Sequence, residues 1–536
     1  MNADRARGAP DITQMQFHSV SSGIEWKTAA RIFALALVCV LPGVACHALL
    51  VPGEARHVGI VHDMLAAQQY LMPRVNGLPV LDGAPLHYWL SLLFLSFLGV
   101  SEWIARLPSV LAAVITVTFL TRTWAVWLPP RSTGTLLLVF VLQPAIIVAS
   151  RFASPDMLSL LLLTVSVNCF LVAAQYLEQG DRHPGWQVGA WVAAGWLGMS
   201  AGPLAALLPL VIGFAWLALR RRFDMLRAMC WWPGPVLLSL IMLPWLWLAD
   251  LRYPGIVTAI LARQLRALTG NWAFGWNETG GIAYVLVIAG SLLPLLLCLL
   301  RFVSPERRRL LRTPAAGLMA VWFFVLVPAH PLAATTMVGP AILLTLPLVY
   351  FGVLALVPLH RPLSKSDGGA WALHIAVIAA VGVAAAHFVM QRVTTLSPLT
   401  EAVSARYHAT HDKVVLLDRF DYEFNFYMRS PKLVYVESDW NRDRNAPVPA
   451  WKADLYEAAR FDPEAASRLL ISPQELTEKL CERRVVNLWL IGSRRDAERH
   501  PILLEMNSIR GPGDARAWYL DASTDLAACS PRSPND

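Results

Sequence analysis

DMLSLLLLTVSVNCFLVAAQYL, residues 156–177, has the length and composition of a membrane-spanning helix. One acid stands at its start, and no charged side chain follows up to residue 177. A hydrocarbon core about 30 Å thick needs roughly 20 apolar residues per helix, because lipid offers backbone amides no hydrogen-bond partner. The stretch therefore predicts a membrane-spanning helix with a carboxylate at its first residue.

Similar apolar runs recur on both sides of this stretch, up to residue 390. The chain of 536 residues is 56% hydrophobic and 15% charged and has 21 Trp, far from the composition of a soluble globular protein. We expect about eleven spans from this hydropathy. They lie near residues 28–50, 107–128, 133–150, 157–177, 186–200, 203–219, 231–248, 281–300, 314–329, 336–358 and 370–390. The predicted fold class is a polytopic α-helical membrane protein.

The polar ends of the chain bound this membrane domain of residues 28–390. Residues 1–27 lack a signal-peptide cleavage site and are expected to form a cytoplasmic tail before a retained first span. Residues 391–536 are polar and charged, and are long enough for one small domain. In them KVVLLDRF, KLVYVES and RRVVNLWLIGS predict strands and ISPQELTEKLCE predicts a helix, so we expect an α/β domain outside the membrane.

Basic side chains predict the orientation, because Lys and Arg stay in cytoplasmic loops. With the N-terminus inside, every strong basic cluster falls on the cytoplasmic side; the clusters are Arg122 with Arg131, Arg220 to Arg222 with Arg227, Arg301 to Arg312, and Arg361 with Lys365. This count requires residues 86–100 to form a short interfacial or re-entrant helix. The outer juxtamembrane loop 51–106, the turn 151–156, the segment 249–280 and the C-terminal domain then share the outer face. The net charge of +8 reflects this orientation, and no nucleic-acid partner is expected.

Charged residues gather in the outer loop next to the first span, and placing their side chains in hydrocarbon would be costly. VPGEARHVGIVHDML, residues 51–65, places Glu54 and Arg56 directly after the first span. Alone, such a pair would commonly anchor a helix at the lipid headgroups. Three further pieces favour a polar site on the outer face: Asp156 in RFASPDMLSL, the stretch PRVNGLPVLDGAPLHYWL with Arg74, Asp82, His87 and Tyr88, and SEWIARLPSVLAAV with Arg106.

These pieces, in this order and spacing, resemble membrane glycosyltransferases of the GT-C fold. The resemblance is greatest to the aminoarabinose-transferase branch of the dolichyl-phosphate-mannose protein mannosyltransferase superfamily. The family elements P-D-E-x-R-Y, F-E-K-P-P-L-x-Y-W, R-L-P-S-A-L and K-G-P correspond to residues 52–57, 81–89, 106–111 and 201–203. The resemblance covers residues 1–220. It implies a GT-C-like fold in the bacterial inner membrane, a periplasmic C-terminal domain, and no cofactor.

The implied activity is transfer of a sugar from a polyprenyl-phosphate-linked donor to a lipid or glycan acceptor. Three motif positions depart from the family: its leading acid is Gly53, its E-K-P lysine is Gly83, and its K-G-P lysine is Ala201. The family's acid is thought to be catalytic, and its E-K-P lysine to hold the donor phosphate. Glu54 lies one residue away, and a shift of one residue rotates a side chain by about 100° on a helix. It can replace the acid only where the backbone is irregular.

Roles for the polar residues follow from the chemistry of such a transfer. The phosphate leaving group is a weak base, so cations that stabilise its charge lower the barrier, and the planar fork of arginine suits that task. We predict that Arg56 binds the donor phosphate, with Arg74, Arg151 and Arg266 as weaker candidates, each of which headgroup anchoring explains better. A carboxylate, Glu54 or Asp156, would orient the acceptor and take its proton. Acceptor or sugar contacts are assigned to Asp82, His87 and Tyr88.

Other readings stay open. His57, His62 and Asp63 are spaced onto different helix faces, so no metal site is expected. Cys481 and Cys529 could pair in an oxidising compartment. The C-terminal domain has no phosphate-binding loop and is assigned a shaping or acceptor-binding role. A family member that has lost catalysis, and a transporter of lipid-linked sugar, are the two alternative functions; a transporter would show internal repeats, which the sequence does not show.

Overall fold

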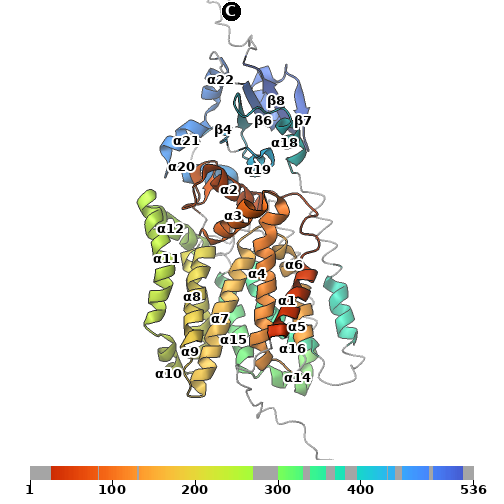
Figure 1. The fold of residues 1–536 in the computed structure, drawn as a ribbon, viewed down its shortest axis with the longest axis vertical. Helices are drawn as coiled ribbons and strands as arrows, with labels where there is room; N and C mark the ends of the chain where they lie inside the picture. The colour runs from red at the N-terminus through yellow and green to blue at the C-terminus, as the bar shows by residue number, and fades with distance from the viewer. Residues whose placement is uncertain are drawn as a thin grey trace, which may run out of the picture.

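The protein has two tiers, a helical bundle and a layer built on a β-sheet at one end of that bundle (Figure 1). The computed structural model describes residues 26–81, 84–129, 132–269, 300–329, 339–357, 368–378, 380, 395–430, 432–440, 449–481 and 487–522. Residues 281–299 of the predicted segment 281–300, most of 370–390, Asp82, Gly83 and Cys529 lie outside the described residues, and so does the side chain of Cys481. The predicted disulfide therefore stays a prediction.

Apolar helices make up the bundle. They are α1 (Trp26–Val40), α4 (Glu102–Thr123), α5 (Ser132–Val141), α6 (Pro144–Ser150), α7 (Asp156–Glu178), α8 (Pro184–Ala201), α9 (Leu208–Leu219), α11 (Pro233–Arg252), α12 (Ile256–Thr269), α15 (Pro314–Ala329) and α16 (Gly339–Leu356), with the short helices η3 (Trp124–Val126), η4 (Pro203–Leu207), α10 (Phe223–Met229), η5 (Leu300–Val303) and α14 (Pro305–Leu310). Among the described residues, α4, α7 and α11 are long and apolar enough to cross a membrane. The protein is a helical membrane protein, and the total of about eleven spans stays a prediction.

Two predicted spans differ in the structure. The first helix ends at Val40, and residues 41–50 form turns and irregular chain that lead to the outer loop. The predicted span 133–150 is broken into α5 and α6, which meet at 65° and together would count as a fourth crossing. Pro144 explains the break, because proline disfavours helical backbone in the preceding residue, and Gln143 is extended with ψ of 125°.

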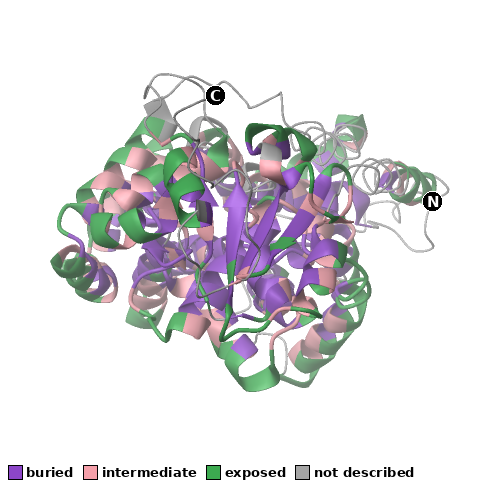
Figure 2. Cartoon of the chain, turned by 90° about the horizontal axis from the view of Figure 1, so that it is seen from above, coloured by how far each residue is buried: buried purple, intermediate pink, exposed green. Residues whose placement is uncertain are grey.

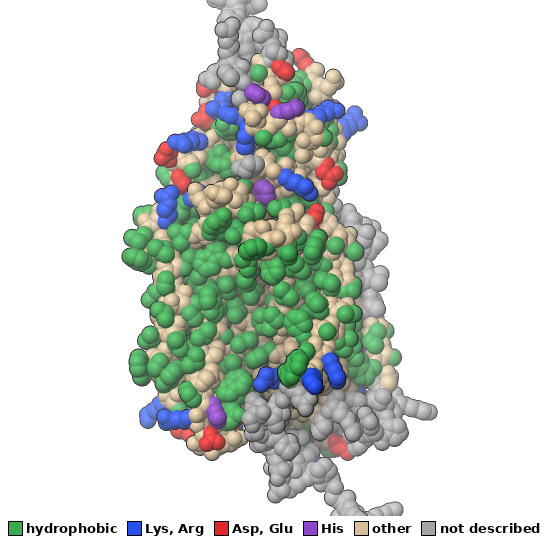
Figure 3. Space-filling model, in the orientation of Figure 1, with side chains coloured by type: hydrophobic (Ala, Val, Ile, Leu, Met, Phe, Trp, Pro, Cys, Tyr) green, Lys and Arg blue, Asp and Glu red, His purple; other side chains and the backbone are tan. Residues whose placement is uncertain are grey.

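Burial separates central helices from peripheral ones. Of an apolar stretch of 18 residues in each helix, 89% is buried in α7 and 22% in α11. Helix α7 therefore lies at the centre of the bundle and α11 at its rim. Hydrophobic side chains cover the outside of the bundle as a broad belt, with charged side chains above and below it (Figure 3). A belt of this kind is the surface that lipid tails require.

The outer loop lies between the two tiers. It forms α2 (Gly53–Ala67), a hairpin of β1 (Arg74–Val75) and β2 (Leu78–Pro79), and α3 (Leu86–Leu98). Helix α3 has 13 residues, too short for a span, and lies with α2 at the end of the bundle that faces the sheet (Figure 1). Although α2 is rich in polar residues, 11 of its 15 are buried, because it is packed from both sides.

The second tier, called the sheet layer below, comprises the described residues from 395 to 522. Its strands are β3 (Asp412–Leu417), β4 (Tyr435–Glu437), β5 (Leu470–Ile471), β6 (Asn487–Ser493), β7 (Ser508–Arg510) and β8 (Ala515–Leu520) in the order β5-β4-β3-β6-β8-β7. Strands β5, β4, β3 and β6 are parallel to one another. Strand β8 is antiparallel to both of its neighbours, β6 and β7. Helices α18 (Ser397–Ser404), α19 (Phe424–Met428), α20 (Ala450–Ala459), α21 (Pro463–Leu469), α22 (Pro473–Cys481) and α23 (Arg494–Arg499) and η7 (Pro501–Leu503) surround the sheet.

Both faces of the sheet are covered, as expected for parallel strands. Leu416 and Trp489 face a core that includes Val58 and Ile60 of α2, whereas Val415 and Leu490 face a second core with Leu476 of α22. Viewed from above, the strands form a buried centre ringed by more exposed helices (Figure 2). One core therefore runs without interruption from the sheet into the outer loop.

Candidate functional site

A buried ion pair joins the outer loop to the bundle. Glu54, in the first turn of α2, and Arg106, in the second turn of α4, are both fully buried. Arg106 donates from Nε to Oε1 of Glu54 at 2.7 Å and from Nη2 to Oε2 at 2.9 Å. Such paired bonds fix both position and plane.

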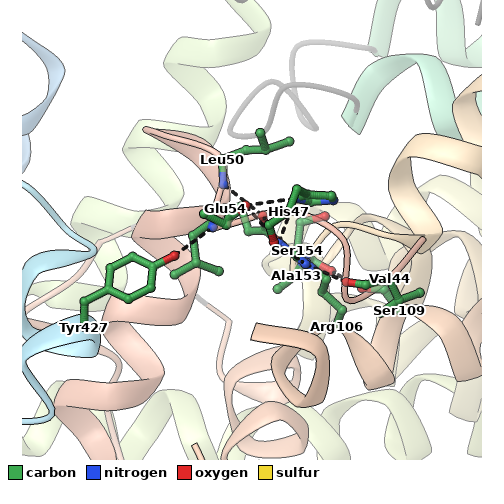
Figure 4. A network of polar contacts seen from close by, with 11 residues as sticks. Val44, His47, Leu50, Glu54, Arg106, Ser109, Ala153, Ser154 and Tyr427 are labelled. Atoms are coloured by element: carbon green, nitrogen blue, oxygen red, sulfur yellow. Dashed lines mark hydrogen bonds and ion pairs between the residues drawn. The ribbon is translucent and has the colours of Figure 1, made fainter. Parts of the chain in front are cut away.

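The remaining donors of Arg106 hold the chain that enters α2. Its Nη1 donates to the carbonyls of Val44 and His47 at 2.6 and 3.0 Å, and its Nη2 donates to the carbonyl of Ala48 at 3.2 Å (Figure 4). Carbonyl groups left outside helices need such partners when they are buried. Arg106 thus sets the path of the turn between α1 and α2.

The turn before α7 meets the same carboxylate. The backbone N–H of Ala153 donates to Oε1 of Glu54 at 3.0 Å, and Leu50 N–H donates to Oε2 at 3.0 Å (Figure 4). Each oxygen of Glu54 therefore accepts two hydrogen bonds. Because α2 is a regular helix from Gly53 onward, the irregular backbone that Glu54 would need to replace the family's acid is absent at this position.

Asp156 lies next to this network. It is the first residue of α7, is 6% exposed, and accepts a hydrogen bond from the hydroxyl of Ser154 at 2.9 Å. A carboxylate in the first turn of a helix is favoured by the positive end of the helix dipole. The turn 151–156 thus contacts Glu54 through the backbone of Ala153 and carries Asp156 three residues later, at the start of α7.

Arg56 points from α2 into the sheet layer. Its Nε donates to Oδ2 of Asp454 on α20 at 2.8 Å, and its guanidinium carbon lies 5.9 Å from the ring centre of Tyr422. Tyr422 donates its hydroxyl to the same Asp454 oxygen at 2.8 Å. Burial opposes ionisation of Asp454, yet Arg56, with its hydrogen bond, lowers the pKa of that carboxyl below its usual range, so Asp454 is charged.

Two histidines and a tyrosine meet between α2 and α3. His57 Nδ1 lies 3.1 Å from the hydroxyl of Tyr88, and the rings of His57 and His87 are 5.9 Å apart, edge to face. Burial lowers the pKa of His57 well below its usual value, with smaller contributions from His87 and Arg56, and burial lowers the pKa of His87 to about 3. Both rings are neutral near pH 7, and a neutral imidazole offers one donor and one acceptor to a hydroxyl group.

The three weaker arginine candidates lie apart from this centre. Arg74 donates to the carbonyl of Gly77 and to the hydroxyl of Tyr253. Arg151 donates to the carbonyls of Pro42 and Ile147, at 2.9 and 3.0 Å. Arg266 is exposed on α12 and donates to Ala262 of its own helix. The geometry gives Arg151 a role in holding the end of α1.

Asp63 ties the outer loop to the sheet layer. Its carboxylate accepts from the backbone of Asn76 at 2.6 Å and from the amide of Asn425 at 3.2 Å. No group of three potential metal-ligating side chains occurs within the described ranges. The arrangement of His62 and Asp63, 3.9 Å apart, is that of a neighbouring pair on one helix.

The segment 201–203 is closed by a residue from α12. Gln264 donates to the carbonyl of Ala201 at 3.0 Å and accepts from the backbone of Leu204 at 3.1 Å. Gly202 has a φ of +97°, which side chains rarely adopt. Ala201, which occupies the position of the family's K-G-P lysine, is thus the last residue of α8 at a chain reversal fixed by Gln264, and it is not part of a cationic site.

Sequence reasoning missed several of these partners. Arg106 had a signal, since a charged residue at the mouth of a span needs a partner. Tyr422, Asp454 and Gln264 had none, because their partners are distant in the sequence; Gln264 and Ala201 are 63 positions apart, and Arg56 and Asp454 are 398 positions apart. The particular contacts between the sheet layer and Arg56 are seen only in the folded structure.

Similarity to known proteins agrees with the motif resemblance. The family described as dolichyl-phosphate-mannose-protein mannosyltransferase matches residues 82–247. The undecaprenyl phosphate-alpha-4-amino-4-deoxy-L-arabinose arabinosyl transferase of Edwardsiella ictaluri is 26% identical over 227 residues, 41% of this chain and 39% of the relative. A Pseudomonas fluorescens transferase of the same description is 27% identical over 245 residues, 44% of this chain and 42% of the relative. The matched region spans about two fifths of these relatives.

Solved structures show the fold. ArnT from Cupriavidus metallidurans, in a crystal structure bound to undecaprenyl phosphate, superposes with a TM-score of 0.71 at 17% identity over 93% of this chain and 99% of that one. The oligosaccharyltransferase AglB from Archaeoglobus fulgidus gives a TM-score of 0.50 at 10% identity over 87% and 69%. The chain has the GT-C fold, and its resemblance to the aminoarabinose-transferase branch is confirmed.

Proposed function

We propose that the protein is an integral-membrane glycosyltransferase of the bacterial inner membrane. It transfers a sugar from a polyprenyl-phosphate-linked donor to a lipid or other envelope acceptor on the periplasmic face. The observation that carries the proposal is the convergence of α2, α4 and the turn before α7 on the buried Glu54 carboxylate, with Asp156 three residues after Ala153 at the end of that turn and Arg56 two residues after Glu54 on α2. The GT-C fold and the similarity to undecaprenyl-phosphate-dependent arabinosyl transferases support it.

The proposed orientation rests on the two ends of the bundle. The arginine-bearing helices α10 and α14 lie at the end opposite the sheet layer (Figure 1). Because basic loops stay in the cytoplasm, that end is the proposed cytoplasmic end. The site, the loop 51–106 and the domain 391–536 then face the periplasm, with the tail 1–27 and about eleven spans arranged accordingly.

Within this proposal, Asp156 is the acceptor-side base. Its carboxylate is at the mouth of α7, where it can orient an acceptor hydroxyl and take its proton as the sugar is transferred. Glu54, whose two oxygens already accept four hydrogen bonds, is assigned the role of positioning Arg106 and the turn before α7. A carboxylate that accepts four hydrogen bonds within the protein orders the site and does not exchange a proton.

Arg56 is the proposed donor-phosphate ligand. Charge develops on the phosphate oxygens as the bond to the sugar breaks, and a fixed guanidinium stabilises that charge. The neutral pair His57 and His87, with Tyr88, is assigned to sugar or acceptor hydroxyls. Arg74, Arg266 and Asp82 remain candidate ligands.

A turnover assay tests the proposal. Purified protein in detergent, given a polyprenyl-phosphate sugar and an envelope lipid extract, is expected to consume the donor. Asp156→Asn should slow donor consumption at least about tenfold, as for loss of a positioned acid or base. The matched control is Asp224→Asn, an exposed acid on α10 at the other end of the bundle, which should leave the rate unchanged. Undiminished turnover by Asp156→Asn would refute the assignment.

The alternative of a family member without catalysis is favoured by two motif positions. Gly53 begins a regular α2, and Ala201 lies in a turn closed by Gln264, so neither place offers the family's charged side chain. This alternative predicts binding of polyprenyl phosphate without consumption of any lipid-linked sugar. The same assay, with binding measured beside turnover, separates the two.

A further inference from the structure

The sheet layer makes a charged contact with the outer loop at Arg56. Asp454 of α20 accepts from Arg56 Nε at 2.8 Å and from the Tyr422 hydroxyl at 2.8 Å, through the same oxygen. The side chains of Arg56 and Asp454 are only 11% and 13% exposed. A charged bond shielded from water to this degree holds its geometry far better than a surface pair does.

The ring of Tyr422 completes the support of Arg56. The guanidinium carbon of Arg56 lies 5.9 Å from the ring centre, within the range of a cation–π contact. Burial raises the pKa of Tyr422, and the charge of Asp454 raises it further, so the hydroxyl keeps its proton and donates. The hydrogen bond to Asp454 and the ring face of Tyr422 together define the plane of the Arg56 guanidinium.

An independent contact fixes α2 against the same tyrosine. Gly59 lies three residues after Arg56 on α2, and therefore on the same side of the helix. A Cβ atom at Gly59 would lie 2.3 Å from the backbone oxygen of Tyr422, closer than real Cβ contacts occur. The absent side chain thus allows α2 to touch the Tyr422 backbone, which sets the distance between Arg56 and its two partners.

We propose that Asp454 and Tyr422 are positioning residues for Arg56, through which the sheet layer orients the donor-phosphate ligand of α2. The inference rests on the proposed function, since it assumes that Arg56 meets the phosphate of a polyprenyl-phosphate-linked sugar. An arginine recognises phosphate through paired, coplanar donors, so the plane of its guanidinium must be set before the ligand arrives. Asp454 and Tyr422 touch Arg56 and not the reacting atoms.

Asp454 also ties this support to the rim of the bundle. Its second oxygen lies 3.5 Å from Nη2 of Arg263 on α12, whose Nη1 donates to Glu457 at 3.1 Å. Glu457 lies one turn after Asp454 on α20 and is 35% exposed. It shares the helix and the arginine but does not contact Arg56, which makes it a matched control.

The test compares donor kinetics and binding of polyprenyl phosphate for the full chain in detergent. We expect Asp454→Asn to raise the donor KM about tenfold, because a lost orienting bond weakens binding of the donor phosphate, and to lower kcat as well, because Arg56 also stabilises the charge that develops on that phosphate. Tyr422→Phe, which keeps the ring and loses the hydroxyl, should raise KM about threefold. Glu457→Gln should change neither constant.

The outcomes separate this inference from the proposed function. Failure of the wild-type protein to bind or consume any polyprenyl-phosphate-linked sugar would overturn the function itself. Normal wild-type turnover with an unchanged or lowered donor KM in Asp454→Asn would overturn the positioning role alone. If Asp454→Asn does not fold, as judged by its thermal unfolding midpoint, Tyr422→Phe decides the question through the same KM.

Discussion

Glu54 and Glu178 each accept a bond from an arginine at similar distances, and yet their surroundings differ completely. Glu54 Oε1 lies 2.7 Å from Arg106 with both side chains fully buried. Glu178 Oε1 lies 3.0 Å from Arg220 with side chains 27% and 32% exposed. Removing one partner of a buried pair leaves an uncompensated charge away from water, whereas an exposed pair is screened and contributes little.

We therefore predict unequal effects of the same chemical change. Glu54→Gln should destabilise the protein by about 3–5 kcal/mol, because Arg106 stays buried with its charge unbalanced. Glu178→Gln should cost less than about 1 kcal/mol. Thermal unfolding in detergent, followed by tryptophan fluorescence, measures both. Equal shifts of the midpoint in the two variants would contradict the structural role assigned to Glu54.

The polar residues also show how far sequence reasoning reaches. Glu54, Arg56 and Asp156 are recognisable because charges beside apolar runs are costly and need a reason. Their partners Tyr422 and Asp454 lie in an ordinary polar segment, where a tyrosine or an acid carries no such signal. Long-range pairing is set by how the tiers pack, and no local pattern records it.

Helices and strands also differ in how well the sequence predicts them. The long apolar run of α7 predicts its helix to within a residue, and β3, β4 and β6 occupy the three stretches read as strands. The apolar length of residues 133–150 predicts one span, whereas Pro144 within that run bends the chain between α5 and α6. Strands β5 and β7 have two and three residues, too few to show the periodicity by which a sequence predicts a strand.

One buried acid joins two elements at the entry to the sheet layer. Glu423, at the N-terminal end of α19, accepts from the backbone of Leu396 at 2.6 Å and from the hydroxyl of Thr395 at 3.3 Å, just before α18. Burial raises the pKa of Glu423 from 4.5 to about 8, and its neighbours only partly offset this effect. The acid is therefore protonated in the folded protein at pH 6.

A pH dependence of stability follows from this junction. Between about pH 5 and pH 8 the folded chain keeps a proton on Glu423 that the unfolded chain has lost, so stability falls as pH rises. We expect the unfolding midpoint of the wild type to fall across this range, and Glu423→Gln to flatten the fall and to be more stable than wild type at pH 8. Glu401→Gln, an exposed acid on α18, is the control. An unchanged slope in Glu423→Gln would contradict the assignment.

At the scale of the whole molecule, charge and apolar surface divide the protein into three zones. A hydrophobic belt surrounds the bundle and the sheet layer lies beyond one edge of the belt; α14, with three arginines, and α10, which follows Arg220 to Arg222, lie beyond the other (Figures 1 and 3). Arginines beyond a membrane edge resist translocation, so the zone of α10 and α14 should be cytoplasmic. The proposed donor site at Arg56 then faces the opposite compartment.

This arrangement predicts the accessibility of single cysteines in a variant that lacks the seven native ones. Glu464→Cys on α21 and Asp224→Cys on α10 replace side chains that are 79% and 67% exposed, so both thiols should react freely wherever reagent reaches them. A membrane-impermeant maleimide added to intact spheroplasts should label the first and spare the second, and permeabilisation should expose both. Labelling of both cysteines before permeabilisation would mean that the belt does not separate two compartments. The reverse pattern would place the Arg56 site in the cytoplasm, where a periplasmic acceptor could not reach it.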